Sequence, residues 1–524
     1  MDRIKENVEY PLFMGVDVGT TNVRSILFDM SGRVIVDSFR GVRILRPEPG
    51  AAEEEPEDLW RATLETMKES LKKSGFKAED VAAIGFSAQM HGVMMLSREG
   101  KPLTRLLTWL DLRAAEQSDE LSRIIGSYEL YRRTGGPPLF IYPLAKILWF
   151  KENMPKKFEE CDKMLSAKDY VMYRMFGEPM IDRSVASGSQ LLNINRLEWD
   201  DEALKAVGIG EERLPRLMDE LEVAGDLPNN VAEQTGLRKG TSIIIGASDA
   251  ALSNIGLGAV EEGVAAVNLG SSGAIRVLSD KPILDRSEKA RLFCYYATEK
   301  RWLPSGAINN AGIILRWFRN TFGMEEVKEA EKLGVDPYDL LTQKAAEVKP
   351  GSEGLVMVPF MAGERFPVRD PKARGVIFGL TLSHGKPHFI RAIMESVIYT
   401  LRWIMEIMKD QGVQIQQVRI GGGGARSPLW RQITADILGK KVAHTRVEEA
   451  SALGAALLAA VKGGFYSSLQ EASRKMVNVI SIHYPDMNNH EGYSSLFRLY
   501  KDLYSSLGRL YKSLGQIERK RERS

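Results

Sequence analysis

Two segments of this 524-residue chain match one another without a gap, and this internal repeat constrains the fold more than any other feature. Residues 15–29, GVDVGTTNVRSILFD, match residues 266–280, AVNLGSSGAIRVLSD, at the apolar positions, the central glycine, the hydroxyl pair and the final Asp. Each segment has the pattern of two strands joined by a small-residue turn. Chance similarity between strand–turn–strand segments is the alternative, but duplication of a half-molecule explains the match better.

Strand and helix patterns alternate around the first copy of the repeat. Apolar residues recur at helical spacing over residues 57–73, and a buried strand is predicted at 81–86. This alternation favours an α/β fold. We expect an amino-terminal domain over residues 1–245, a second domain over 246–465, and a helical extension over 466–524.

The extension carries a stripe of tyrosines, leucines and one phenylalanine at helical intervals over residues 493–514. Such a stripe predicts one long amphipathic helix, whose apolar face is either core or a subunit interface. A homodimer is the assembly that an interface of this kind would form.

Composition excludes several classes of function. The formal net charge of +2 supplies no basic field for nucleic-acid binding. Cys161 and Cys294 are the only cysteines and are far apart, so neither a disulfide framework nor a cysteine zinc site is expected. No window approaches the roughly 20 apolar residues of a membrane helix, and residues 1–11 do not resemble a secretory signal. We expect a cytoplasmic protein.

The common nucleotide-binding and zinc-protease motifs are absent from the sequence. The two repeated turns instead offer backbone N–H groups and hydroxyls of the kind that bind phosphate oxygens. The predicted phosphate contacts are Gly19, Thr20 and Thr21 in the first turn and Gly270, Ser271, Ser272 and Gly273 in the second.

Two aspartates stand where phosphoryl transfer would need carboxylates. Asp17 precedes the first turn within a strand, where a buried carboxylate calls for a cation, so we assign it to Mg²⁺. Capping of its own turn is the alternative. Asp249 follows a predicted strand at 243–245 and is placed to accept a proton from a substrate hydroxyl. An N-cap of the following helix, 250–255, is the alternative, and the two roles are compatible.

Four segments together resemble the FGGY family of carbohydrate kinases: residues 15–21, 246–249, 268–273 and 421–431, in that order. The resemblance implies two actin-like (ribonuclease H-like) domains related by duplication, with an active-site cleft between them. It also implies ATP, Mg²⁺ and transfer of the γ-phosphoryl group to a sugar hydroxyl. Carried over by position, Asp17 is similar to the metal carboxylate and Asp249 to the general base. The glycine run, with Gly422, Gly423, Gly424 and Ser427, resembles the loop that holds adenosine.

The substrate is suggested by the segment that follows the strand at 81–86. Gln89, Met90 and His91 resemble the sugar-site residues of gluconate and xylulose kinases rather than glycerol kinases. The run around Asn309 favours gluconate kinases, so D-gluconate, giving 6-phosphogluconate, is the expected small-molecule substrate. D-xylulose or another pentulose is the alternative. Lys146, Arg113 and Arg365 are the candidate cations for a substrate carboxylate, and the sequence does not choose among them.

A non-kinase actin-like ATPase is the more distant alternative, because duplicated actin-like folds also occur in chaperones and filaments. Only about sixty residues follow residue 461, which leaves no room for a separate peptide-binding domain of about 100 residues. The sequence therefore favours a kinase.

Overall fold

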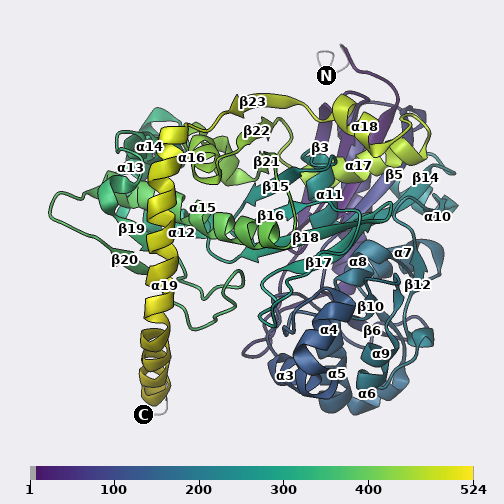
Figure 1. The fold of residues 1–524 in the computed structure, drawn as a ribbon. Coiled ribbons are helices and arrows are strands. Elements are labelled where there is room, and N and C mark those ends of the chain that lie inside the picture. Colours follow the sequence, from purple (N-terminus) through teal and green to yellow (C-terminus); the bar gives the residue numbers. More distant parts are fainter. Residues whose placement is uncertain (1–6, 523–524) are drawn as a thin grey trace. The chain divides into compact units, whose positions relative to one another are not determined.

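A computed structural model describes residues 7–522 of the chain, with side chains to residue 517 (Figure 1). Residues 1–6, part of the amino-terminal stretch in which no secretory signal is expected, lie outside the described residues. The chain forms two compact units, each assembled from three segments. The first unit comprises the residues up to Glu262, Leu278–Pro304 and Glu449–Asn478, and the second comprises Gly263–Val277, Ser305–Glu448 and the residues from Val479 onward.

The first unit contains a six-stranded sheet. Three strands form an antiparallel meander, two more continue parallel to the first of these, and an antiparallel strand completes the sheet. In order across the sheet they are β13 (Val223–Asp226), β14 (Ser242–Ser248), β5 (Val81–Ala88), β1 (Leu12–Val18), β2 (Asn22–Phe28) and β3 (Val34–Gly41).

The second unit repeats this arrangement strand for strand. In the same directions and order it has β23 (Val479–His483), β22 (Lys441–Thr445), β21 (Gln417–Gly421), β15 (Val264–Leu269), β16 (Gly273–Val277) and the second half of β18 (Arg301–Ile308). The turn between β1 and β2 thus has its counterpart between β15 and β16. The duplication predicted from residues 15–29 and 266–280 is visible in the topology, and the predicted α/β fold class is confirmed.

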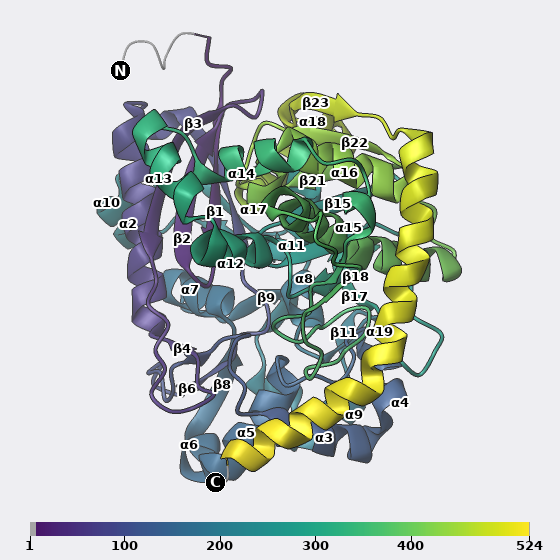
Figure 2. The same ribbon diagram turned by 90° about the vertical axis from the view of Figure 1, so that its left-hand side faces the viewer.

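Helix α2 (Pro56–Ser74) packs against β2 and β3 of the first sheet (Figure 2). Helix α17 (Ala450–Lys462) packs against β1, β5 and α11 (Asp249–Gly256). The approach of α17 is close because two strand positions are glycines. A Cβ on Gly15 would lie 2.0 Å from the carbonyl oxygen of Ala452, and one on Gly85 would lie 2.1 Å from that of Ala455. Glycine at both positions therefore lets helix and sheet backbones touch.

The segment between β5 and β13 is largely helical, and most of it forms a lobe with its own hydrophobic core, whereas the buried hydrophobic residues within 167–175 belong to the core of the six-stranded sheet. Its helices are α3 (Ala115–Leu121), α4 (Ser127–Thr134), α5 (Pro143–Asn153), α6 (Pro155–Glu160), α7 (Ala167–Phe176), α8 (Arg183–Ser187) and α9 (Asp201–Val207). Short strands link them: β6 (Met94–Ser97), β7 (Leu106–Leu107), β8 (Cys161–Leu165), β9 (Met180–Asp182), β10 (Leu192–Asn193), β11 (Glu198–Trp199) and β12 (Arg216–Met218). The remaining elements of the first unit are β4 (Glu53–Glu54), α10 (Asn229–Thr235), β17 (Phe293–Thr298) and α18 (Leu469–Met476).

Helices of the second unit begin and end where the sequence provides caps. Ser427 caps α16 (Pro428–Leu438) through the N–H of Trp430, Pro428 opens the helix, and Gly439 ends it with φ 64°. The other helices and strands of this unit are α12 (Gly312–Phe322), α13 (Met324–Leu333), α14 (Pro337–Ala346), α15 (Lys386–Asp410), α19 (Met487–Glu522), β19 (Val356–Val358) and β20 (Val376–Phe378).

Helix α19 confirms the long helix predicted over residues 493–514. Tyr493, Phe497 and Tyr500 are buried, and the Tyr493 hydroxyl donates to buried Glu395 of α15 at 2.7 Å. This part of the aromatic stripe therefore belongs to the core of the second unit. Within residues 7–522, no helix is both long and apolar enough to span a bilayer.

The compact units differ from the three contiguous ranges expected from the sequence. Residues 246–262 and 449–478 lie in the first unit, because β14 pairs with β5 and α17 packs on β1 and β5. The expected helical extension also needs correction, since β23 lies between α18 and α19. Its three β-branched residues, Val479, Ile480 and Ile482, favour an edge strand beside β22.

We predict that Gly15→Ala lowers the free energy of unfolding by about 1–3 kcal/mol, because the new methyl group would overlap the backbone of α17. Gly492→Ala is the matched control, because a Cβ there meets nothing within 4 Å and alanine favours the helix. Urea unfolding of both variants measures the difference. Equal midpoints for the two variants would contradict the packing argument.

Candidate functional site

Asp17 lies near the end of β1, beside the first turn. Its Oδ2 accepts a hydrogen bond from the Ser451 hydroxyl of α17 at 2.9 Å, whereas Oδ1 is buried without a hydrogen-bond partner. Burial raises the pKa of Asp17 above its usual range, although Ser87, Ser451, Arg24 and Lys168 act in the opposite direction. A carboxylate with a buried, unpaired oxygen fits a cation ligand. Among the described residues, no three or more acidic, histidine or cysteine side chains gather as a metal site.

The first turn is tied to the rest of the first unit through Thr20. The Thr20 hydroxyl donates to Gln89 Oε1 at 2.8 Å and accepts from Trp109 Nε1 at 3.1 Å. Gln89 Nε2 in turn donates to Glu54 Oε2 at 2.8 Å. Thr21 is exposed, and the N–H of Gly19 closes the turn on Asn22 O at 3.1 Å. Trp109 and Glu54 were not among the predicted site residues, because nothing in their local sequence points to this turn.

His91 follows β5 in a left-handed conformation, with φ 68°. Its Nδ1 lies 2.6 Å from the carbonyl oxygen of Gly188, which only accepts, so Nδ1 carries a proton and Nε2 is the acceptor nitrogen of the neutral ring. The ring stands edge-on to Tyr142, with centroids 5.1 Å apart. Met90 is buried beside Gly188. His91 and Met90 are therefore held by contacts within the first unit.

Two of the three candidate cations have internal roles in this structure. Lys146 is fully buried, and its Nζ donates to the carbonyl oxygens of His91, Thr108 and Ile141 at 2.7, 2.7 and 2.8 Å. Burial lowers its pKa to about 7. Arg113 pairs with Asp111, Glu53 and Glu48, and its guanidinium covers the Trp149 ring. Their charges serve the fold, which corrects the expectation that either would bind a substrate carboxylate.

Asp249 comes directly after β14, as predicted, and is the first residue of α11. Ser248 is the N-cap, since its hydroxyl accepts from the N–H of Ala251 at 3.2 Å, which corrects the alternative reading of Asp249 as the cap. Asp249 Oδ1 accepts from the N–H of Ala250 at 2.7 Å. The carboxylate therefore stands at the carboxyl end of a buried parallel strand, where α/β sheets place their ligands.

A buried ion pair holds the end of β14 in place. Lys168 Nζ lies 2.5 Å from Asp182 Oδ2 and donates to the carbonyl oxygens of Ile245 and Ala247. The register of β14 is irregular here, and Gly246 has φ 70°, with the position of a Cβ only 1.8 Å from Phe86 O. A lysine bridging two carbonyls across this bulge fixes the direction in which Asp249 leaves the strand.

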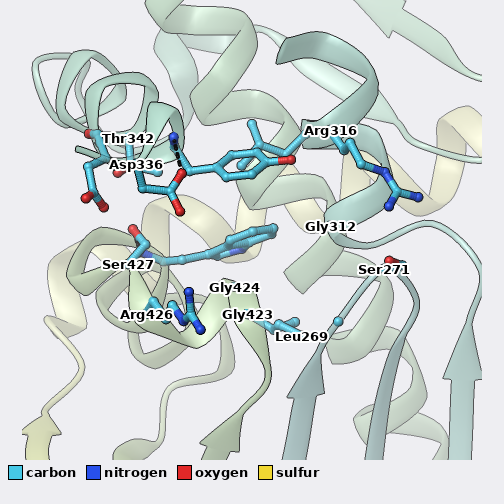
Figure 3. Close-up of a pocket in the computed structure, with 15 residues that line it drawn as sticks. Leu269, Ser271, Gly312, Arg316, Asp336, Thr342, Gly423, Gly424, Arg426 and Ser427 are labelled. Carbon is cyan, nitrogen blue, oxygen red and sulfur yellow. Dashed lines mark hydrogen bonds between the residues drawn. The ribbon is translucent and has the colours of Figure 1, made fainter. Parts of the chain in front are cut away.

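The second unit contains a cavity of about 340 Å³ that joins the second turn to the glycine run (Figure 3). Ser271 and Arg316 lie at one end of it, and Gly423, Gly424, Arg426 and Ser427 lie along its floor (Figure 3). The full lining is Leu269, Gly270, Ser271, Gly312, Leu315, Arg316, Asp336, Tyr338, Asp339, Thr342, Gly423, Gly424, Arg426, Ser427 and Trp430. Two predicted phosphate contacts and three predicted adenosine contacts thus share one cavity.

The other predicted nucleotide residues have different positions. Ser272 is exposed, Gly273 is buried at the start of β16, and neither lines the cavity. Gly422 has φ 84°, and a Cβ on it would lie 2.3 Å from Asn268 Oδ1. The backbone can therefore adopt this conformation only with glycine at position 422. A Cβ on Gly423 would meet nothing within 4 Å.

Asn309 lies between β18 and α12, within a hydrogen-bonded loop. Its N–H donates to Glu364 Oε1 at 2.5 Å, and its Oδ1 accepts from Arg365 Nε at 2.7 Å. Asn310 Nδ2 donates to Glu364 Oε2 at 2.9 Å. Burial raises the pKa of Glu364 to about 7. This carboxyl, which sequence reasoning did not single out, holds both asparagines in place.

Comparison with known proteins decides the family. The model of the FGGY family of carbohydrate kinases, N-terminal domain, matches residues 12–256, and that of the C-terminal domain matches residues 265–463. The chain belongs to the FGGY family of carbohydrate kinases. It is thus an ATP-dependent phosphotransferase that acts on a small-molecule sugar substrate, and the non-kinase ATPase alternative is excluded.

Relatives of known name cover nearly the whole chain. The gluconokinase of Bacillus subtilis (strain 168) is 37% identical over 491 residues, 94% of this chain and 95% of that protein. The xylulose kinase of the same strain is 31% identical, with 94% and 96% covered. Among solved structures, the gluconate kinase from Lactobacillus acidophilus has a TM-score of 0.87 and 30% identity, covering 96% of this chain and 99% of that one. The ligand-bound xylulose kinase from that species has a TM-score of 0.89, 30% identity and the same coverage.

We predict that Gly423→Leu weakens ADP binding to this FGGY protein about tenfold, or about 1.4 kcal/mol, because the leucine would occupy the cavity of the second unit. Its unfolding midpoint should stay near that of the parent, since no neighbour lies near the new Cβ. Isothermal titration with ADP measures the affinity, and Gly492→Leu on α19 is the control. Unchanged ADP affinity would show that the nucleotide binds elsewhere.

Proposed function

We propose that this kinase phosphorylates D-gluconate to 6-phosphogluconate. The observation that supports this most is the 37% identity to a gluconokinase over 94% of the chain, against 31% for a xylulose kinase. The Asn309 run, which resembles that of gluconate kinases, is held by a network around Glu364 and Arg365. D-xylulose or another pentulose is the alternative substrate, favoured by the solved xylulose kinases of similar fold.

In this proposal each unit supplies part of the reaction. The first unit binds the sugar acid through Gln89, Met90 and His91, where His91 Nε2 accepts a hydrogen bond from a substrate hydroxyl. The cavity of the second unit holds the adenosine of ATP between the glycine run and α14. The hydroxyl turns contact the phosphates. Transfer then requires Asp249 to reach the acceptor hydroxyl, with water excluded in the reacting complex.

Asp249 acts as the general base. Its carboxylate takes the proton from the attacking hydroxyl as that oxygen bonds to the γ-phosphorus and the bond to the leaving ADP oxygen breaks. Asp17 is the residue that would hold Mg²⁺, which neutralises charge on the phosphates when bound. A cytoplasmic location and a homodimer remain predictions.

The substrate is tested with a coupled assay of ADP release over D-gluconate, D-xylulose, L-ribulose, L-fuculose and glycerol. We expect D-gluconate to give a kcat/KM at least about tenfold above the others, a difference of about 1.4 kcal/mol in transition-state binding. A larger kcat/KM with D-xylulose would contradict the gluconate assignment and leave the kinase class intact. Release of ADP that none of the five compounds stimulates would contradict both substrates.

We predict that Asp249→Asn lowers kcat by about 100-fold or more while changing the KM for the sugar little, because the amide cannot accept the proton. Steady-state kinetics with the preferred sugar measure both constants. The control is Asp226→Asn, an exposed carboxylate on the edge strand β13 of the same unit, which should leave kcat unchanged. Near-normal turnover of Asp249→Asn would refute the base assignment.

A further inference from the structure

Four polar side chains from four separate segments of the first unit form one hydrogen-bonded chain. It runs from Trp109 Nε1 to the Thr20 hydroxyl, from that hydroxyl to Gln89 Oε1, and from Gln89 Nε2 to Glu54 Oε2. The distances are 3.1, 2.8 and 2.8 Å. Glu54 is fully buried and Gln89 is 2% exposed, so little solvent competes for these bonds.

We propose that Glu54 is a positioning residue of this kinase: it orients the Gln89 amide, which then commits the Thr20 hydroxyl to the protein and leaves Thr21 as the phosphate-binding hydroxyl of the first turn. The proposal deepens the proposed function and rests on its assignment of that turn to phosphate. It gives Thr20 a different role from the one expected from the sequence.

The direction of each bond follows from the chemistry of the groups. An indole N–H only donates, so the Thr20 oxygen accepts from Trp109. The single proton of Thr20 points to Gln89 Oε1, because the other end of that amide donates its N–H to Glu54. Thr20 therefore has no proton left for a phosphate oxygen. Without an acceptor at position 54, the Gln89 amide would lose the partner that fixes its orientation.

The backbone around this chain is fixed as well. The N–H of Gln89 donates to Val18 O at 2.9 Å, which joins β5 to the start of the turn. Glu54 lies in β4, paired with Leu106 of β7, and the loop after β7 carries Trp109. Thr108 donates to Ala52 O through both its N–H and its hydroxyl. The pairing of β4 with β7 thus places Glu54 and Trp109 at the two ends of the hydrogen-bonded chain.

Thr21 stands in contrast to its neighbour. It is exposed at the tip of the turn, and the structure gives its hydroxyl no hydrogen bond within the described residues. In the repeated second turn its counterpart Ser272 is exposed as well, and so is Ser271, the counterpart of Thr20. With the Thr20 hydroxyl bonded to the protein and the Thr21 hydroxyl available, the first turn would be a rigid phosphate contact with a single donor side chain.

The kinetic test compares Glu54→Leu, Glu54→Gln, Thr20→Val, Thr21→Val and the double variant Glu54→Leu/Thr20→Val. We expect Glu54→Leu and Thr20→Val each to lower kcat/KM for ATP about ten- to a hundredfold, as small displacements of a reacting group do. The kcat/KM for ATP of the double variant should be no lower than that of the more impaired single variant, because both substitutions break the same hydrogen-bonded chain. Glu54→Gln retains an acceptor for Gln89 Nε2 and should restore near-parental kinetics.

Thr21→Val should also lower kcat/KM for ATP but should combine multiplicatively with Glu54→Leu, because Thr21 lies outside the chain. Parental kinetics in Glu54→Leu, or multiplicative effects of Glu54→Leu and Thr20→Val, would overturn the proposal. The assay uses whichever sugar the parent phosphorylates best, so failure of the gluconate assignment leaves this test intact.

Unfolding supplies a readout that does not depend on activity. Burial raises the pKa of Glu54 to about 8, with the Gln89 bond acting in the opposite direction. Its neighbours Glu53 and Glu55 are paired with Arg113 and Arg105. A carboxyl with a raised pKa costs the folded state stability as pH rises from its ordinary pKa toward 8. The midpoint of Glu54→Gln should therefore exceed that of the parent by more at pH 8 than at pH 5.

The unfolding midpoints also give a second double-mutant cycle, besides the kinetic one. The losses of midpoint in Glu54→Leu and Thr20→Val should be less than additive in the double variant, because one chain is broken twice. Additive losses, or a difference between Glu54→Gln and the parent that does not change with pH, would contradict the coupling.

Discussion

The contact of α17 with β1 and β5 is the constraint on which the first unit depends. Two strand glycines, Gly15 and Gly85, remove the Cβ atoms that would otherwise strike the carbonyls of Ala452 and Ala455. Helix backbone can then lie against sheet backbone, and Ser451 reaches Asp17 at 2.9 Å. The helix also packs on α11, which begins with Asp249. A segment from late in the sequence is thus needed to complete the surroundings of both aspartates.

Buried charged and polar groups hold the functional loops in place. Lys146 ties together the backbone of three segments around His91, and Lys168 does the same across the bulge of β14 below Asp249. Glu54 and Glu364 serve turns of the first and second units in a similar way. Desolvating such groups is costly unless their hydrogen bonds are made, so each is retained where it fixes a loop that the strands alone leave undetermined. In the proposed function, these loops are prearranged parts of the kinase site.

Much of this architecture could be read from residue patterns. The ungapped match of residues 15–29 with 266–280 predicted the paired hairpins, because strand periodicity and turn residues are local properties. Helix α16 begins and ends where Ser427, Pro428 and Gly439 stand, because local chemistry marks its ends. The positions of Asp17 at a turn and Asp249 after a strand were predicted for the same reason. Sequence patterns did not reveal β23, because a short exposed edge strand has weak periodicity.

The sequence by itself determined the duplicated α/β fold, the family and the segments that carry chemistry, because each segment that indicates them is a local pattern of about fifteen residues or fewer. Only the tertiary structure decided which polar groups are already satisfied. From the sequence alone, Lys146 and Arg113 are candidate cations for a substrate, but the structure shows that carbonyl and carboxylate groups of the protein bind them. Thr20 is likewise a candidate phosphate ligand, but its hydroxyl is bonded to Gln89 and Trp109. These partners lie far along the chain, and only folding brings a hydrogen-bond donor and its acceptor together.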